Sequence, residues 1–223
     1  MWAVVPVKEM QDAKQRLAGC LDPAERRALV KAMLGDVLEA LGAVSLLKGV
    51  LVVTRDPEAA RCAASAGARV LDEIGEEGLN AALEQASAYL AAQGARGIVV
   101  VPGDVPSFRA SELTSILEFH EGPGARVSLV SDRHGLGTNC IACSPPDLCR
   151  FHFGEGSFAA HQEEALKRAA EIRTLTPAGL QLDVDTAEDL DALALIQVGK
   201  RTGRLLESLS ASSQDRQAIG VSA

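Results

Sequence analysis

Aromatic residues are scarce in this chain. Phenylalanine, tyrosine and tryptophan make up 3% of its 223 residues, and Trp2 and Tyr89 are the single tryptophan and tyrosine. Basic residues are also in the minority: 22 lysines and arginines face 30 aspartates and glutamates, which gives a net charge of −8. Single-stranded nucleic acid needs aromatic rings for stacking, and a negative surface repels a phosphate backbone. We therefore expect no nucleic-acid partner, whereas a local basic site for a small phosphorylated ligand remains compatible with the composition.

Long hydrophobic runs are lacking as well. No segment reaches the roughly 20 consecutive apolar residues that cross a bilayer, and the N-terminus has no basic region followed by a long apolar run. We therefore expect a cytoplasmic protein with no membrane partner. Among five cysteines, Cys140 and Cys143 form one Cys-x-x-Cys pair, and no second pair completes a zinc ribbon. Because positions three apart on a strand face opposite sides, we expect ordinary buried thiols.

The apolar pattern predicts one α/β domain over residues 1–200. Hydrophobic residues make up 47% of the chain, and short β-branched runs alternate with longer helical patterns, as in a mostly parallel sheet flanked by helices. The expected strands are 3–7, 49–54, 69–71, 97–101, 126–131, 139–144, 171–174 and 181–184. The expected helices are 23–41, 57–66, 79–93, 110–119, 157–169 and 187–198. Residues 201–223 are expected to form a flexible C-terminal tail, because the sequence from Ser208 onward loses periodicity.

Ligands of open α/β sheets bind beyond the carboxyl ends of the strands, so the segments after each expected strand are the first candidates. The first strand is followed by three cations, Lys8, Lys14 and Arg16. Ammonium and guanidinium groups neutralise phosphate oxygens, so this loop can hold a triphosphate; a solvated basic loop is the alternative. P-loop and Gly-x-Gly-x-x-Gly patterns are absent from the sequence, which disfavours P-loop hydrolases and dehydrogenases.

A second candidate is the segment 75–83, which leads from a turn into a helix. Gly78 allows a ligand to approach the backbone closely, and Asn80 offers both a donor and an acceptor to a nucleoside. A plain loop-to-helix turn is the alternative, since such turns often contain glycine and asparagine.

Three aspartates after expected strands predict a magnesium site. Asp104 lies in a stiff loop between two prolines, while Asp183 and Asp185 project to the same face of an expected strand. Paired carboxylates repel each other, and a divalent cation with oxygen ligands compensates for this. The alternatives are a turn role for Asp104 and a helix cap formed by Thr186 with Asp189, although such a cap leaves Asp183 and Asp185 free.

Two glycine-rich segments, 132–139 and 153–158, form the last candidate. The second opens a helix, so its free amides and the Ser157 hydroxyl can bind a phosphate or carboxylate, and Thr138 and Asn139 can add side-chain hydrogen bonds. Ordinary turns are the alternative. His161 lies one turn into that helix, and we expect a packed or solvated residue there rather than a catalyst.

Taken in order, these motifs resemble the guanylyltransferases of coenzyme F-420 biosynthesis. Those enzymes are called 2-phospho-L-lactate, phosphoenolpyruvate or 3-phospho-D-glycerate guanylyltransferases according to their substrate. The resemblance covers roughly residues 3–195 and rests on the following motifs: Val-Pro-Val-Lys with Ala-Lys-x-Arg-Leu at 13–17, Gly-Leu-Asn at 78–80, Pro-Gly-Asp at 102–104, Asp-Arg-x-Gly-x-Gly-Thr-Asn at 132–139, Phe-Gly-x-Gly-Ser at 153–157 and Asp-Val-Asp-Thr at 183–186.

The resemblance implies a three-layer nucleotidyltransferase domain of the GT-A-like, Rossmann-related type. It also implies GTP as co-substrate, Mg²⁺ as cofactor and a three-carbon phospho-acid that receives GMP while pyrophosphate is released. A downstream deazaflavin-transferring enzyme and a second copy of the chain in a homodimer are the candidate macromolecular partners, and the sequence leaves the oligomeric state open. The chain departs from the family at Glu76-Glu77, where a more glycine-rich loop is usual, and at Cys140, where a smaller residue is usual.

The expected roles follow from the motifs and the resemblance together. The expected metal ligands are Asp104, Asp183 and Asp185. The expected catalytic residues are Lys8, Lys14, Arg16 and Asp104. The expected nucleotide-binding residues are Val5, Pro6, Lys8, Lys14, Gly78, Asn80, Pro102 and Gly103. The expected acceptor-binding residues are Gly137, Thr138, Asn139, Gly154, Gly156 and Ser157. Another nucleotidyltransferase, a glycosyltransferase or a nucleotide-binding module without turnover remain the alternatives.

Overall fold

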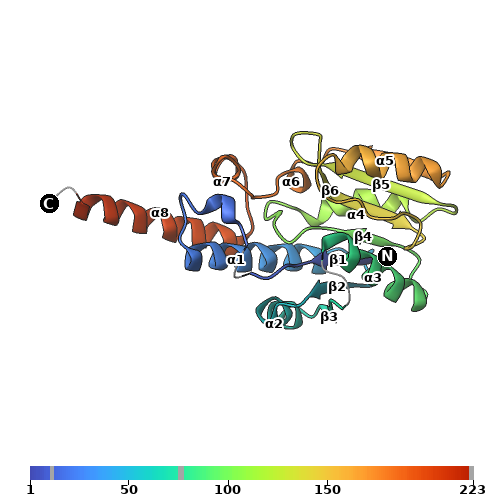
Figure 1. The fold of residues 1–223 in the computed structure, drawn as a ribbon, viewed down its shortest axis with the longest axis horizontal. Coiled ribbons are helices and arrows are strands. Elements are labelled where there is room, and N and C mark those ends of the chain that lie inside the picture. The colour runs from blue at the N-terminus through green and yellow to red at the C-terminus, as the bar shows by residue number, and fades with distance from the viewer. Residues whose placement is uncertain (11–12, 75–77, 221–223) are drawn as a thin grey trace.

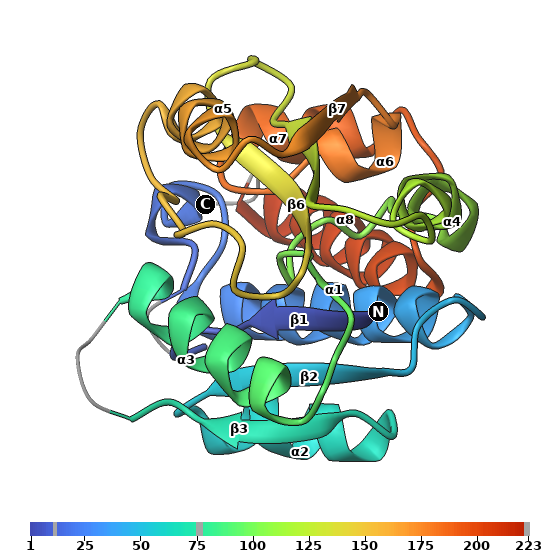
Figure 2. The same cartoon turned by 90° about the vertical axis from the view of Figure 1, so that its right-hand side faces the viewer.

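A twisted sheet forms the centre of the computed structural model, which describes residues 1–10, 13–74 and 78–220 (Figures 1 and 2). Its strands stand in the order β3-β2-β1-β4-β6-β5-β7. The strands are β1 (Trp2–Pro6), β2 (Gly49–Thr54), β3 (Arg69–Asp72), β4 (Ile98–Val100), β5 (Arg126–Ser131), β6 (Thr138–Ser144) and β7 (Glu171–Leu175). The helices are α1 (Pro23–Gly42), α2 (Pro57–Ser65), α3 (Leu79–Ala92), α4 (Ala110–Phe119), α5 (Ser157–Lys167), α6 (Ala178–Gln181), α7 (Ala187–Leu193) and α8 (Lys200–Gly220), with a 3-10 turn at Gln15–Leu17.

One strand, β6, runs against the others. The pairs β1–β2, β1–β4, β2–β3 and β5–β7 are parallel, whereas β6 is antiparallel to both β4 and β5. The first residue of β6, Thr138, therefore lies at the same sheet edge as the carboxyl ends of β1 and β4. This inversion brings the segment 132–139 to the edge at which the basic loop and Asp104 also lie.

Helices cover both faces of the sheet, which confirms the predicted three-layer, mostly parallel α/β architecture. Alternate residues of each central strand point to opposite faces: Val5 belongs to a buried cluster with α1, α2, α4, α6 and α7, while Val4 belongs to a second cluster with α3 and α5. α1 begins where Asp22 caps the helix and Pro23 occupies its first turn, a pairing that satisfies a free amide and fixes φ. Burial of both clusters holds the loops at the strand ends in place.

The expected strand at 181–184 is wrong. Gln181 ends α6, and residues 182–186 are extended chain without strand pairing; Val184 donates one backbone hydrogen bond to the carbonyl of Asp104, at 3.1 Å. Leu182 and Val184 are buried while Asp183 and Asp185 are half-buried. An extended segment has the same side-chain alternation as a strand, which is why the pattern suggested one.

The expected tail from residue 201 begins as helix instead. α8 starts at Lys200, and its first turns pack against α1, where the Asp36 carboxylate accepts hydrogen bonds from the backbone amides of Arg201 (3.0 Å) and Thr202 (2.8 Å). Thr202 is fully buried. Figure 1 shows α8 continuing past the end of α1, away from the sheet. An aspartate on another helix supplies the cap that the local sequence lacks, and no local pattern reveals it.

The cysteines are all free thiols. Cys140 lies in the buried cluster on one face of the sheet and Cys143 in the cluster on the other, which confirms the expectation of ordinary buried thiols. Within the described part of the chain, no helix combines the length and the apolar character that a membrane span requires.

Candidate active site

The side chain of Lys14 bridges two aspartates from distant parts of the chain. Its ammonium nitrogen lies 2.5 Å from Asp104 Oδ2 and 2.6 Å from Asp185 Oδ1. The side chain is 9% exposed although the residue belongs to the loop after β1, where it adopts a left-handed backbone conformation with φ of 56°. Burial lowers the pKa of Lys14, but the two carboxylates outweigh this and hold the pKa above its ordinary value. Lys14 is therefore charged throughout the neutral range.

Asp183 completes the acidic group. Its Oδ1 accepts a hydrogen bond of 3.0 Å from the side-chain amide of Asn139 at the start of β6. Burial raises the pKa of Asp183; the Asn139 bond lowers it, and the negative charges of Asp104 and Asp185 raise it again. The structure thus brings the three sequence-selected aspartates into one electrostatic neighbourhood, and Asn139 joins that neighbourhood to β6.

The chemistry of this acidic group fits a divalent cation. Oδ1 of Asp104 is buried and lacks a hydrogen-bond partner among the described residues, and hard carboxylate oxygens are the ligands that Mg²⁺ prefers. The described residues nevertheless contain no group of three or more acidic, histidine or cysteine side chains already arranged around one ion position. The Lys14 ammonium provides the positive charge between Asp104 and Asp185 instead. Lys14 occupies Oδ2 of Asp104 and Oδ1 of Asp185, so a cation that binds through these two oxygens has to displace Lys14.

The other two cations of the basic loop point into solvent. Lys8 is exposed, and Arg16, with a side chain that is 76% exposed, lies 3.9 Å from Asp185 Oδ2. On the same edge, Pro6 ends β1 and Gly103 follows β4, and a Cβ atom at Gly103 would come within 3.3 Å of a Leu34 methyl on α1. The lack of a side chain at Gly103 thus lets this loop lie close to α1. Lys14 and Arg16 lie next to the acidic group, where their charges can neutralise a polyphosphate.

Asn80 does not keep its amide free for a nucleoside. Its Oδ1 accepts from the backbone amide of Phe153 at 2.8 Å, and its Nδ2 donates to the Phe153 carbonyl at 3.1 Å. This pair of bonds ties the start of α3 to the segment before Gly154. Gly78, with φ of 130°, precedes α3 as expected for a loop that approaches a ligand, while Glu76 and Glu77 lie outside the described residues.

The two glycine-rich segments meet at the site edge. The Thr138 backbone amide donates to Ser157 Oγ at 2.9 Å, and the Phe158 amide donates to the Leu136 carbonyl at 3.1 Å. The backbone amide of Gly137 donates a hydrogen bond to the Asp132 carboxylate, which closes the first segment into a turn. In the second segment, glycines at 154 (φ 137°) and 156 (φ 68°) turn the chain into the N-terminus of α5, whose first amide, that of Ser157, donates to the Gly154 carbonyl at 3.2 Å.

The sequence analysis missed a link between the 132–139 segment and the segment that carries Asp183 and Asp185. Asp189 Oδ2 accepts from the backbone amides of Asp185 (3.0 Å) and Thr186 (2.7 Å), which confirms the predicted cap of Thr186 with Asp189. Its Oδ1 also binds the Arg133 guanidinium at 2.8 Å. Arg133 therefore connects the 132–139 segment to the backbone beside Asp185. The sequence carried no signal for this pair, because the two residues lie far apart in the chain.

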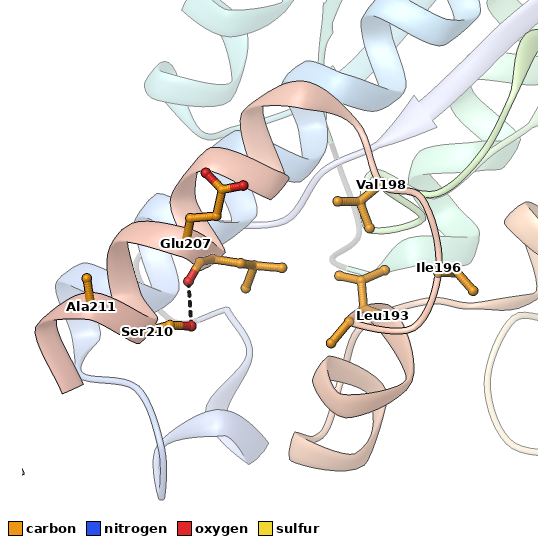
Figure 3. Close-up of a pocket in the computed structure, with 8 residues that line it drawn as sticks. Leu193, Ile196, Val198, Glu207, Ser210 and Ala211 are labelled. Atoms are coloured by element: carbon orange, nitrogen blue, oxygen red, sulfur yellow. Dashed lines mark hydrogen bonds between the residues drawn. The ribbon is translucent and has the colours of Figure 1, made fainter. Parts of the chain in front are cut away.

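A groove of about 490 Å³ opens elsewhere, between α7 and the middle of α8 (Figure 3). Its described lining is mostly apolar, with Leu193 and Val198 facing α8, and it contains one acidic side chain, Glu207, and no basic one. None of the residues selected from the sequence lines it. The groove lacks the positive charge that a triphosphate requires, so the candidate active site is the edge described above.

Comparison with known proteins shows the family of the chain. Residues 1–219 match a protein family described as guanylyl transferase CofC like. A phosphoenolpyruvate guanylyltransferase of Sphaerobacter thermophilus is 41% identical over 86% of this chain and 91% of its own length. A 2-phospho-L-lactate guanylyltransferase of Methanothermobacter thermautotrophicus is 35% identical over 93% of this chain and 90% of its own length.

The fold is similar to that of a solved structure. A nucleotidyl transferase from Methanothermobacter superposes with a TM-score of 0.65 at 18% identity, covering 93% of this chain and 98% of the other. At that identity the likeness concerns the fold, which is of the nucleotidyltransferase type. With the family match along nearly the whole sequence, the conclusion is that this chain is a nucleotidyltransferase that belongs to the CofC-like guanylyl transferase family.

Proposed function

We propose that the enzyme transfers GMP from GTP to a three-carbon phospho-acid and releases pyrophosphate, as a step of coenzyme F-420 biosynthesis in the cytoplasm. Phosphoenolpyruvate is the first candidate acceptor, since the relative at 41% identity carries that name, and 2-phospho-L-lactate is the second. The observation that best supports this proposal is the hydrogen bond between Asn139 and Asp183. It joins the hydroxyl-lined start of β6 to the acidic group, as transfer between two bound substrates requires.

The reaction needs little acid–base chemistry from the protein. The acceptor phosphate is largely ionised at neutral pH, since its second pKa is about 6, so one of its oxygens attacks the α-phosphorus of GTP directly. A new P–O–P bond forms as the bond from the α-phosphorus to the bridging oxygen breaks, and pyrophosphate leaves with that electron pair. No enzyme nucleophile or strong general base takes part in this scheme.

The chain supplies alignment and charge. Asp104, Asp183 and Asp185 are proposed to hold Mg²⁺, which when bound neutralises the negative charge of the polyphosphate. Lys14, released from its aspartates, binds the same polyphosphate together with Lys8 and Arg16. The hydroxyls of Thr138 and Ser157 and the amides near Gly154 bind the phospho-acid.

The nucleotide is proposed to lie along the loops after β1 and β4. Val5, Pro6, Pro102 and Gly103 would line its path, with Gly78 approaching the base. Asn80 would act on the nucleotide only through the second N–H of its amide and the second lone pair of its oxygen, because one N–H and one lone pair are engaged with Phe153. A homodimer and a downstream deazaflavin-transferring enzyme belong to the same proposal.

The test is product formation with defined acceptors. Purified protein is incubated with GTP and Mg²⁺ and with phosphoenolpyruvate, 2-phospho-L-lactate or 3-phospho-D-glycerate in turn, and pyrophosphate release is followed with the deazaflavin-transferring enzyme present to capture the product. Release that depends on one of the acids supports the proposal. GTP binding without pyrophosphate release from any acid would contradict it, and transfer of a sugar without pyrophosphate would indicate a glycosyltransferase.

A further inference from the structure

His161, which the sequence analysis assigned to packing, has a hydrogen-bond partner at each ring nitrogen. The side chain is fully buried on α5. Its Nε2 lies 2.9 Å from the backbone amide nitrogen of His152, and its Nδ1 lies 2.9 Å from Oγ1 of Thr138. A backbone amide can only donate, so Nε2 of His161 is the acceptor in the first of these bonds.

The location of the ring proton follows from this contact. Burial, with a smaller contribution from His152, lowers the pKa of His161 to about 4, so the ring is neutral at neutral pH; a hydrogen bond from the ring to the Ser157 backbone opposes this shift and helps to hold the ring proton. A neutral imidazole carries one N–H. Since Nε2 accepts, the proton is on Nδ1, and Nδ1 donates it to the Thr138 hydroxyl oxygen.

Two hydroxyls at the site edge are consequently left with free protons. Thr138 Oγ1 receives a hydrogen bond from His161, and Ser157 Oγ receives one from the Thr138 backbone amide. Each hydroxyl still has its own O–H to donate, and neither oxygen has a further partner within the described residues. Two hydroxyl donors at the start of β6 and at the positive N-terminal end of α5 favour a negatively charged oxygen as their ligand.

We propose that His161 is a positioning residue that holds the Thr138 hydroxyl as a hydrogen-bond donor to an anionic oxygen of the phospho-acid. The inference rests on the proposed function for the identity of that anion. His161 does not touch the substrate: it acts through Thr138, and Ser157 donates in parallel.

A purely structural role for His161 predicts something different. Through Nε2 the ring also pins the backbone at His152, next to the Phe153 backbone that Asn80 holds. If the bond to His152 were the important one, His161 would fix the backbone conformation of the 150–156 segment and would have no effect on the Thr138 hydroxyl. The two ring nitrogens can be separated by substitution, because an asparagine amide reaches the position of Nδ1 and a glutamine amide the position of Nε2.

The decisive pair is therefore His161→Asn and His161→Gln, assayed for the KM of phosphoenolpyruvate and of GTP. We expect His161→Asn to keep the acceptor KM within about 3-fold of the unmodified enzyme, and His161→Gln to raise it about 10-fold while the GTP KM stays unchanged. In a Thr138→Val background, His161→Gln should add no further increase. A glutamine variant with normal acceptor KM and an asparagine variant with a raised one would overturn the proposal.

His120 provides a matched control. It is also buried, its pKa is also lowered to about 4 by burial, and its ring nitrogens lie 2.8 Å from Ser144 Oγ and 3.0 Å from Ser128 Oγ. It lies at the opposite edge of the sheet from Thr138. His120→Asn should lower the melting temperature and leave the acceptor KM unchanged. An equal rise in acceptor KM would mean that loss of any buried histidine disturbs the pocket, and the proposal would fail.

A spectrum tests the hydrogen-bond direction without any turnover. In protein labelled with ¹⁵N-histidine, the resonances missing from His161→Asn identify His161, and we expect them to show a proton on Nδ1 that persists from pH 8 to about pH 5.5. A proton on Nε2, or titration in that range, would overturn the inference. If no acid accepts GMP, the proposed function fails while this spectrum still decides the state of His161.

Discussion

The ammonium nitrogen of Lys14 lies 2.5 Å from a carboxylate oxygen of Asp104, although the two residues are 90 positions apart in the chain. Lys14 follows β1 and Asp104 follows β4, the strand that pairs with β1, so the sheet places both at one edge. The same ammonium reaches Asp185. Lys14 thus neutralises the carboxylates that are proposed to receive Mg²⁺.

Replacing Lys14 tests this exchange of cations. We expect Lys14→Met to cost roughly 2 kcal/mol of unfolding free energy without metal, less than a fully buried pair because the Asp185 side chain is 45% exposed. Mg²⁺ should then raise the melting temperature of the variant more than that of the unmodified protein, since nothing competes for the carboxylates. Turnover should fall at least about 100-fold, because the polyphosphate loses a ligand.

Lys31 gives the control for this experiment. It pairs with Glu58 at 3.0 Å with a side chain that is 55% exposed, and it lies on α1. Lys31→Met should leave both turnover and the Mg²⁺ response unchanged. A Mg²⁺ response in Lys14→Met that is no larger than in the unmodified protein would show that Lys14 and the metal do not share the site.

Asp183→Asn separates the charge of Asp183 from its shape. The amide oxygen of asparagine can still accept from Asn139, so the fold should be retained, and because burial raises the pKa of Asp183 a neutral side chain should not lower the melting temperature. Pyrophosphate release at saturating Mg²⁺ should fall at least about 100-fold through loss of a metal ligand. Near-normal pyrophosphate release would show that Asp183 is not a metal ligand. The control is Asp147→Asn, because Asp147 is exposed and lies at the opposite edge of the sheet.

Asn80→Ala should affect the acceptor as well as the nucleotide. The substitution removes two hydrogen bonds to Phe153, each worth about 1 kcal/mol, and loosens the segment that leads into Gly154. We expect a loss of roughly 2 kcal/mol in unfolding free energy and a raised KM for the phospho-acid. Separate KM measurements for GTP and acceptor check this. A rise in the GTP KM alone would assign Asn80 to the nucleoside only.

The buried histidines predict an acid-sensitive fold. Burial lowers the pKa values of His120 and His161 to about 4, against about 6.5 in an unfolded chain. Between these values the unfolded state binds more protons than the folded state, so the free energy of unfolding falls as the pH falls through that window. At about pH 5 each histidine should cost on the order of 2 kcal/mol relative to pH 7.5.

Urea unfolding at the two pH values measures the effect. His120→Asn lacks one of the two titrating rings, so its loss of unfolding free energy between pH 7.5 and 5 should be smaller by about 2 kcal/mol. An identical pH dependence in the variant and the unmodified protein would show that His120 is not held in its neutral form.

Local sequence was sufficient for most of the secondary structure. The strand predicted at 126–131 and the helix at 110–119 coincide with β5 and α4, and α1 begins at Pro23, where the helix over 23–41 was expected to begin. These elements could be predicted because apolar periodicity and end signals act between neighbouring residues. The ordered motifs likewise carried the family resemblance, since they are short stretches whose residue types can be read directly.

Tertiary structure alone decided how the selected residues are used. The Lys14 bridge, the engagement of Asn80 with Phe153 and the capping of α8 by Asp36 each join segments that are far apart in the chain. The same holds for His161, whose role depends on Thr138 across the boundary between α5 and β6. A hydrogen bond or ion pair needs its atoms within about 3 Å, and only packing of the whole sheet and its helices sets that distance. The sequence therefore determined which groups are available, and the fold determined which of them meet.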